Sequence, residues 1–257
     1  MPNKTFLNPL IFFGICISCN TTYQPQKIQY KDYTINRATP ASSSLNALLQ
    51  PFADSVNKSM NDVIGVAAET LEKKQPEGLL GNFIADAMLA KAREKYLQPV
   101  DIAVMNSGGI RLTTIAAGNI TRGKIFELSP FDNVIVIQKI TGLQLQVFLD
   151  HIANGMQRDR ALDKGAWPVA GMTFQIKNYK AINIKIGGTA MEDVKTYSMS
   201  LLDYVANGGD NASMLRKIPQ VNRGYIFRDA IIEYISQFSK SGKKISSKLE
   251  NRVSYAD

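Results

Sequence analysis

The sequence predicts an α/β fold class (mixed α+β), in which helices and strands are mixed without strict βαβ alternation. Two segments carry apolar residues at helical spacing, 81–95 and the stretch after Thr141. Short apolar runs at 101–105 and 134–137 are typical of buried strands. The chain of 257 residues is 45% hydrophobic and 20% charged, which is ordinary for a globular protein with a full core. Without an internal repeat, a single mixed domain is the simplest organisation.

The first predicted elements lead up to the clearest helix. Residues 45–60 are predicted to form a helix, 62–68 a strand, and 73–75 with Pro76 a loop. The apolar positions of the first helix are Leu45, Leu48, Leu49, Phe52, Val56 and Met60. The clearest helix, 81–95, places one apolar face at Phe83, Ile84, Ala87, Met88 and Ala92.

Two threonines mark the starts of later helices. Thr121 is expected to cap a short helix through Phe126, and Thr141 is expected to cap a longer one. The longer helix has an apolar stripe at Leu145, Phe148, Leu149 and Ile152. The remaining predictions are strands near 169–176, 182–186 and 196–202, a turn at 207–210 and a helix near 228–238.

Residues 1–18 resemble a bacterial lipoprotein signal peptide, which is cleaved before a lipid-modified cysteine. Lys4 begins a short positive region, and 6–17 form an apolar stretch too short for a comfortable membrane span. Ser18 places a small residue directly before Cys19. The alternative is an ordinary secretory signal with an incidental cysteine.

Cleavage before Cys19 would leave one cysteine, which is acylated, so no disulfide is expected and the core depends on packing. We therefore expect the protein to be lipid-anchored in the bacterial cell envelope, in the outer membrane or facing the periplasm. Residues 19–44 are expected to form a surface tether with one short edge strand near 27–36. The domain then covers 45–257, and we expect the chain to be complete at its start.

Composition excludes several kinds of chemistry. The formal charge is +8, but no block of basic residues is interleaved with aromatic ones, so nucleic acid is not an expected partner. His151 is the one histidine, and we predict that it is an exposed surface residue. One histidine cannot build a usual two-metal phosphoesterase centre or a His-based zinc site. We therefore predict no catalytic residues, no metal ligands and no cofactor in this chain.

The segment 106–111 (NSGGIR) directly follows the predicted strand 101–105. Asn106 and Arg111 stand at the two ends of a glycine turn, where side chains do not crowd the backbone. An amide and a guanidinium suit a small ligand with hydrogen-bonding edges and an anionic group. The alternative is a plain strand-to-loop turn with an exposed arginine.

Four separated segments together resemble one family. They are 80–86 (LGNFIAD), 106–111 (NSGGIR), 128–133 (LSPFDN) and 203–210 (DYVANGGD). In this order they are similar to the C-terminal, substrate-binding domain of the 5'-nucleotidase / UDP-sugar hydrolase family, over roughly 45–257. The resemblance implies a fold of layered helices and mixed sheets. It also implies that this domain holds the nucleoside, while a separate metallophosphatase domain carries two metal ions and performs hydrolysis.

The resemblance assigns roles to individual residues. Phe131 and Tyr204 match the two aromatic residues that sandwich the base, although phenylalanine is also common at the second position. Asp210 matches the carboxylate that accepts hydrogen bonds from the ribose hydroxyls. Of the other matched positions, Asn106 and Asn133 lie near the base, Arg111 reaches toward phosphate, and Lys74 replaces a family arginine.

The residue types agree with these roles. Base stacking on an aromatic face contributes roughly 1–3 kcal/mol. A carboxylate can accept both hydroxyl donors of a ribose cis-diol. Lys74 keeps the charge of the arginine but loses its planar fork, so a contact there is expected to be weaker or absent. The alternatives are that Phe131 is a core aromatic, that Tyr204 is a half-buried strand residue and that 207–210 form a simple turn.

These observations lead to one leading hypothesis and two rivals. The leading hypothesis is a lipid-anchored subunit that binds an adenosine- or AMP-like nucleoside or nucleotide and supplies specificity to a 5'-nucleotidase. The metallophosphatase half, with its divalent metals, would be a separate polypeptide. The first rival is a nucleoside-binding envelope receptor without enzymatic function. The second is a structural lipoprotein that keeps the fold without the ligand.

Overall fold

The computed structural model describes residues 27, 29–34, 36, 39–162 and 165–256. The chain divides into two units, Met1–Asn46 and Ala47–Asp257, and each is considered by itself. The expected signal peptide (1–18) and Cys19 lie outside the described residues, as does part of the expected tether. The edge strand expected near 27–36 is wrong for residues 27, 29–34 and 36. These residues are exposed, so nothing buries the apolar face that would stabilise a strand.

Helix α1 spans Ser43–Met60 and confirms the first predicted helix. Its apolar side chains are nevertheless exposed, and none of its residues is buried. The helical spacing therefore predicted the element correctly but not its environment. Among the described residues, no helix is both long enough and apolar enough to cross a membrane.

The centre of the second unit is a five-stranded mixed sheet. Its order is β12-β6-β11-β3-β7. Strand β11 is parallel to β3, with Ser200 opposite Ala103, and antiparallel to β6, with Leu202 opposite Ile135. The strands are β3 (Ile102–Val104), β6 (Val134–Thr141), β7 (Val169–Ala170), β11 (Thr196–Leu202) and β12 (Gln220–Ile226).

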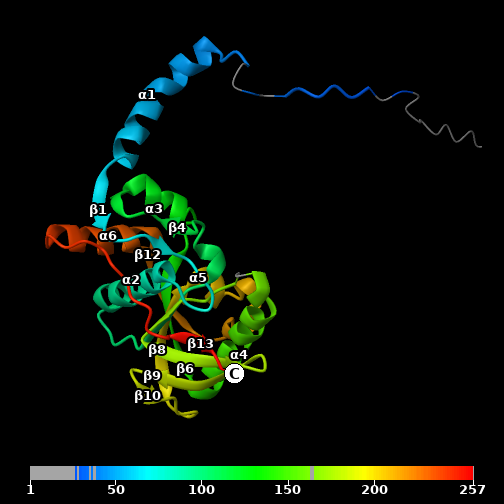
Figure 1. Cartoon of the computed structure of the whole chain (residues 1–257), viewed down its shortest axis with the longest axis vertical. Coiled ribbons are helices and arrows are strands. Elements are labelled where there is room, and N and C mark those ends of the chain that lie inside the picture. The colour runs from blue at the N-terminus through cyan, green and yellow to red at the C-terminus, as the bar shows by residue number, and fades with distance from the viewer. Residues whose placement is uncertain (1–26, 28, 35, 37–38, 163–164, 257) are drawn as a thin grey trace, which may run out of the picture. The chain divides into compact units, whose positions relative to one another are not determined.

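Both faces of the central strands are buried, so alternate residues of one strand enter different cores. Ile135 and Ile137 of β6 pack with helices α2 (Leu79–Tyr96) and α6 (Phe227–Lys240). Val136 packs instead with α4 (Gly142–Arg158), which carries the predicted stripe of apolar residues. Figure 1 shows α2 and α6 side by side. The ring of Phe83 on α2 contacts the ring of Tyr234 on α6, with centroids 5.6 Å apart. The fold is a layered α/β arrangement, as the sequence predicts.

A second sheet covers the outer side of the α4 core. Its order is β10-β9-β8-β13, and in Figure 1 β8, β9 and β10 lie at the lower end of the unit near α4. The single strand predicted near 169–176 is in fact two, because Gly171 breaks it with φ +75°. A side chain at Gly171 would lie 2.2 Å from the carbonyl oxygen of Asp101. The strands are β8 (Met172–Lys177), β9 (Lys180–Ile186), β10 (Thr189–Ala190) and β13 (Val253–Tyr255).

Short elements complete the unit. Thr121 caps α3 (Arg122–Leu128) by accepting a hydrogen bond from the Lys124 amide at 3.2 Å, as predicted. Thr141 forms a complete capping box with Gln144 at the start of α4. Helix α5 is a single turn, Asp203–Ala206, directly after β11. The small strands are β1 (Val63–Ala67) paired with β5 (Gly118–Thr121), and β2 (Leu71–Glu72) paired with β4 (Thr114–Ile115).

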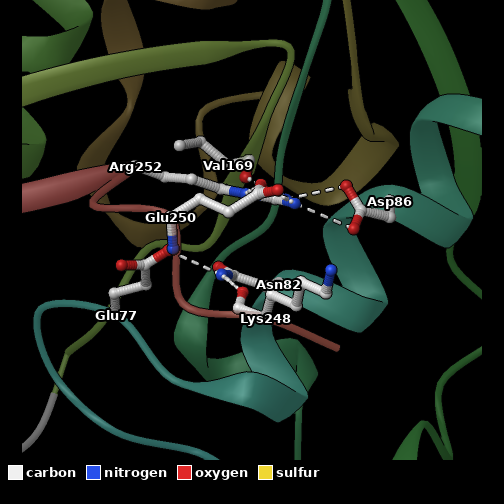
Figure 2. Close-up of polar contacts among 7 residues, drawn as sticks. All are labelled: Glu77, Asn82, Asp86, Val169, Lys248, Glu250 and Arg252. Carbon is white, nitrogen blue, oxygen red and sulfur yellow. Dashed lines mark hydrogen bonds and ion pairs between the residues drawn. The ribbon is translucent and has the colours of Figure 1, made fainter. Parts of the chain in front are cut away.

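A polar network ties the C-terminal segment to α2 (Figure 2). The guanidinium of Arg252 forms hydrogen bonds of 2.7 and 2.9 Å to the two carboxylate oxygens of Asp86. It also donates to Glu250 Oε2 and to the carbonyl of Val169. Asn82 Nδ2 donates to Glu77 Oε1 at 2.6 Å and to the carbonyl of Lys248 at 2.7 Å. We call this network the C-terminal clamp, formed by Glu77, Asn82, Asp86, Lys248, Glu250 and Arg252.

Candidate functional site

The sheet topology brings three chain segments to one edge. The parallel strands β3 and β11 both end at this edge, and the antiparallel strand β6 begins there. The segment after β3 contains Asn106 and Arg111, the loop before β6 contains Phe131, and α5 after β11 contains Tyr204. Asp203 Oδ1 accepts hydrogen bonds from the amides of Val134 and Tyr204, which fixes α5 against the start of β6.

A cavity of about 380 Å³ opens at this edge. Six of the seven predicted ligand-binding residues line it, together with Gly108 and Gly109. The seventh, Lys74, is not among the lining residues, and its Nζ lies 2.8 Å from Glu72 Oε2. The six lining residues are Asn106, Arg111, Phe131, Asn133, Tyr204 and Asp210. We call this cavity the aromatic pocket.

The two aromatic residues of the pocket are exposed rather than part of the core. Phe131 is 45% exposed and Tyr204 is 46% exposed. Gly209 lies directly against the ring of Tyr204, because a Cβ at Gly209 would be 2.5 Å from two ring atoms. One side of the Tyr204 ring is thus supported by backbone. An aromatic surface held in place while exposed is suited to stacking on a planar ligand.

The loop that carries Phe131 is anchored from below by Arg228 of α6. Arg228 is 8% exposed, and its Nη1 donates to the carbonyls of Ser129 and Phe131. Its Nη2 lies 2.6 Å from Asp132 Oδ1, and the amide of Phe227 donates to the carbonyl of Asn133. The sequence analysis did not identify Arg228. No local pattern marks it, because its partners are almost a hundred residues away.

Asp210 is held by four hydrogen bonds to three residues, which are Asn106, Tyr204 and His151. Its Oδ2 accepts a 2.6 Å hydrogen bond from Asn106 Nδ2, and its Oδ1 accepts a 3.1 Å bond from the Tyr204 hydroxyl. The Asp210 amide donates back to the Tyr204 oxygen at 3.3 Å, and its carbonyl lies 3.0 Å from His151 Nε2. Asn106 is 3% exposed, and its Oδ1 has no hydrogen-bond partner among the described residues. The pocket therefore contains an unpaired buried acceptor beside a rigidly held carboxylate.

Positive charge gathers at Arg111. The Arg111 guanidinium lies 5.9 Å from the centroid of the Phe131 ring, which places a cation near the aromatic face. Lys73 Nζ donates to the carbonyl of Ile110 at 2.8 Å. Burial, reinforced by the positive charge of Arg111, lowers the pKa of Lys73. The lysine beside Arg111 is thus Lys73, whereas Lys74, which matches the family arginine, pairs with Glu72.

The prediction that His151 is an exposed surface residue is wrong. It is half-buried on α4, and its Nε2 contacts the carbonyl of Asp210. Helical position alone suggested a polar face, and the residues that cover this face come from sixty positions later in the chain. The neighbouring Asp150 points elsewhere, because its Oδ1 accepts from the amide of Ala181 at 2.9 Å. The two residues do not form a pair.

Metal-ligating side chains are not gathered anywhere in the part of the chain that the structure describes. No group of three or more His, Cys, Asp or Glu residues there could hold a metal ion. The pocket itself offers one carboxylate, whose two oxygens are both already hydrogen-bonded. These residues do not fit a metal centre, so no metal-dependent step is derived for this chain.

The fold and the pocket together define a class of protein: a layered α/β domain with a cavity where β3 and β11 end and β6 begins. A family model described as 5'-nucleotidase, C-terminal domain, matches residues 57–217. The chain therefore belongs to the 5'-nucleotidase C-terminal domain family.

Individual relatives agree with this assignment. The chain is 32% identical over 197 residues to Protein UshA of Escherichia coli, which covers 75% of this chain and 34% of that protein. It is 29% identical over 247 residues to the trifunctional nucleotide phosphoesterase YfkN of Bacillus subtilis, covering 90% of this chain and 16% of YfkN. A crystal structure of a 5'-nucleotidase precursor from Thermus thermophilus superimposes on this chain with a TM-score of 0.70 at 25% identity. The match covers 82% of this chain and 43% of that precursor. This chain spans about a third or less of these curated relatives.

Proposed function

We propose that this protein binds a nucleoside or nucleotide and supplies the specificity of a 5'-nucleotidase-type phosphohydrolase. One observation carries the proposal: Phe131, Tyr204 and Asp210, which are distant in sequence, line one cavity. Its volume of about 380 Å³ lies in the range of small-molecule sites. Names of relatives, such as the nucleotide phosphoesterase of B. subtilis, support the same ligand class.

Each wall of the pocket suits one part of a nucleoside. The exposed faces of Phe131 and Tyr204 would stack on the base. The Asp210 carboxylate has lone pairs beyond those used by Asn106 and Tyr204, so it can still accept from ribose hydroxyls. Asn106 and Asn133 also line the pocket, where their amide groups would lie near the base. Arg111 would attract an anionic tail such as phosphate.

Hydrolysis would require a partner. The described residues contain no cluster of side chains that could hold a metal ion. A separate metallophosphatase would supply its own divalent metals and a metal-activated water. This chain would hold the nucleoside so that the phosphate reaches that water, which is a contribution through positioning.

Calorimetry tests the binding step. We expect adenosine and AMP to release heat when titrated into the purified protein. The Phe131→Ala variant should bind about tenfold more weakly, because it loses one stacking face. Tyr179→Ala is a matched control, since Tyr179 is also an exposed aromatic but does not line the pocket. No heat with the wild type, or equal binding by Phe131→Ala, would contradict the proposal.

The partner and the anchor need separate experiments. We expect the protein to capture a metallophosphatase whose AMP hydrolysis depends on added divalent metal and falls when Phe131→Ala replaces the wild type. Binding without such a phosphatase would favour a nucleoside receptor instead.

We also propose that Cys19 is acylated, which would place the protein in the membrane fraction of the cell envelope. A Cys19→Ser variant that stays in that fraction would contradict the anchor.

A further inference from the structure

We propose that His151 is a positioning residue for sugar recognition, acting through the backbone of Asp210. The inference rests on the proposed nucleoside function and concerns a residue to which that function assigns no role. His151 is the single histidine of the chain, and its Nε2 lies 3.0 Å from the carbonyl oxygen of Asp210. It does not line the aromatic pocket, so its effect on a ligand there must pass through Asp210.

The backbone of Asp210 is in a conformation that needs support. Its φ is 50° and its ψ is 35°, and Asn211 follows with φ 62°. This left-handed region is uncommon for residues other than glycine, and it persists where surrounding contacts fix it. The direction of the Asp210 carboxylate follows from this backbone conformation. Whatever fixes the peptide group of Asp210 therefore helps to aim the carboxylate into the aromatic pocket.

Asp210 stands between two cavities. Asp210 lines the aromatic pocket and also a second cavity of about 470 Å³. His151 lines only the second cavity, together with Asn154 and Arg158 of the same helix. The side chain of Asp210 is held by Asn106 and Tyr204, whereas its carbonyl is held by His151. His151 thus supports Asp210 from the side that the ligand does not occupy.

Helix α4 gives His151 a rigid base. The helix begins with the Thr141 capping box, and its stripe from Leu145 to Ile152 is buried. The ring of Phe148 packs edge-on against Trp167, with centroids 5.7 Å apart. A hydrogen bond from such a helix restricts its partner more than one from a mobile loop would. When Nε2 donates to the carbonyl, Nδ1 carries no proton in the neutral ring.

A purely structural hydrogen bond would predict a different pattern of ligand affinities. If His151 only stabilised the loop, its removal would weaken every ligand of the aromatic pocket alike. If it aims the Asp210 carboxylate, removal should weaken only ligands with sugar hydroxyls. Adenosine and 2',3'-dideoxyadenosine share the base and differ in these hydroxyls. Comparing the two ligands therefore separates positioning from general stabilisation.

The experiment measures both dissociation constants by NMR titration for the wild type, His151→Leu and His151→Gln. We expect His151→Leu to bind adenosine about tenfold more weakly, because the part-buried hydrogen bond that fixes the Asp210 peptide is lost. Its affinity for dideoxyadenosine should stay within about twofold of the wild type. His151→Gln keeps an amide donor and should recover most of the adenosine affinity. In an Asp210→Ala background, His151→Leu should have no further effect on adenosine.

The outcomes separate the two proposals. Dideoxyadenosine binding by His151→Leu shows that the variant is folded and that its pocket is formed. Equal losses for both ligands, or no loss for adenosine, would overturn the positioning role while leaving the nucleoside function in place. Failure of the wild type to bind either ligand would overturn the proposed function and this inference with it.

Discussion

The aromatic pocket and the C-terminal clamp are both polar sites that join distant segments, but they differ in what is left unpaired. In the clamp, Arg252 pairs with Asp86, and Asn82 donates to Glu77 and to the carbonyl of Lys248. No buried side-chain nitrogen or oxygen of the clamp lacks a partner. In the pocket, Asn106 Oδ1 is buried without a partner in the described chain, and two aromatic side chains are nearly half exposed. The buried polar atoms of the clamp are thus paired within the chain, whereas one polar atom of the pocket residue Asn106 is not.

This difference indicates that the clamp contributes to the stability of the fold and that the pocket contributes to ligand binding. A satisfied network stabilises the fold, and an unsatisfied polar group beside exposed rings indicates a place where a ligand completes the contacts. The backbone agrees, because Asp210 in the pocket has a left-handed conformation. The comparison predicts that clamp variants change stability with little effect on the pocket. Pocket variants should change binding with little effect on stability.

The largest expected effect is a loss of stability in the clamp. Arg252→Met removes the bonds to Asp86, Glu250 and the Val169 carbonyl, and leaves partly buried acceptors unpaired. We expect the free energy of unfolding to fall by about 1–2 kcal/mol, because partly buried acceptors lose their donor while the exposed partners Asp86 and Glu250 remain solvated. Urea denaturation measures the change. Arg252→Lys, which keeps the charge, should lose less, and unchanged stability in Arg252→Met would contradict the role of the clamp.

Arg228 combines the two roles, because it is a buried structural residue that also supports the pocket. It is buried, as Asn82 of the clamp is, but it anchors the loop that carries Phe131. Arg228→Met should lower the free energy of unfolding by about 1–2 kcal/mol and also weaken adenosine binding, because the loop loses its hydrogen bonds. Asp132→Asn is the control, since Asp132 is the exposed partner and the bonds to the carbonyls remain. Loss of stability without loss of binding would show that the loop does not depend on Arg228.

Gly209→Ala tests the support of the Tyr204 ring. The added methyl would lie 2.5 Å from two ring atoms, so the ring must move from its place over Gly209. We expect adenosine binding to weaken about fivefold, which is about 1 kcal/mol, with a smaller change in melting temperature. Gly155→Ala is a suitable control, because a methyl there meets nothing within 4 Å. Unchanged affinity in Gly209→Ala would argue against stacking on Tyr204.

The smallest expected effect is acid sensitivity of another paired cluster. Lys91 Nζ lies 2.8 Å from Glu94 and 2.9 Å from Glu233. The hydrogen bond from Lys91 holds the pKa of Glu94 below its ordinary value of 4.5. A lowered carboxyl pKa stabilises the fold above pH 4.5, and this contribution is lost as the pH falls through the lower, folded-state value.

Glu94→Gln measures this contribution. At pH 7 the variant should be less stable than the wild type by about 0.5 kcal/mol, because Glu94 is largely exposed and its charge is screened. The difference should shrink as the pH falls below 4.5 and also in high salt. Unfolding curves at several pH values measure it. A difference that persists unchanged in acid would show that the ion pair is not its source.

Much of the fold could be predicted because it depends on local patterns. The stripe from Leu145 to Ile152 and the Thr141 cap define α4 from one segment. Strands β12 and β13 were missed because β12 is almost wholly exposed and β13 is only three residues long. Their pairing with β6 and β8 depends on partners far along the chain.

The site could be predicted in part for the same reason. Phe131, Tyr204 and Asp210 lie in recognisable segments, so a resemblance to a known family could place them. The supports of these residues could not be found in this way. Arg228 and His151 act through backbone carbonyls of residues 97 and 59 positions away, and no local motif records such contacts. Lys73, which lies beside Arg111 and donates to the carbonyl of Ile110, carries no local motif that would have identified it.

A crystal structure of the protein grown with adenosine would test the central claim most directly. The account predicts the base between the rings of Phe131 and Tyr204, with the ribose hydroxyls within hydrogen-bond distance of the Asp210 carboxylate. Adenosine bound elsewhere, with the aromatic pocket empty, would contradict it.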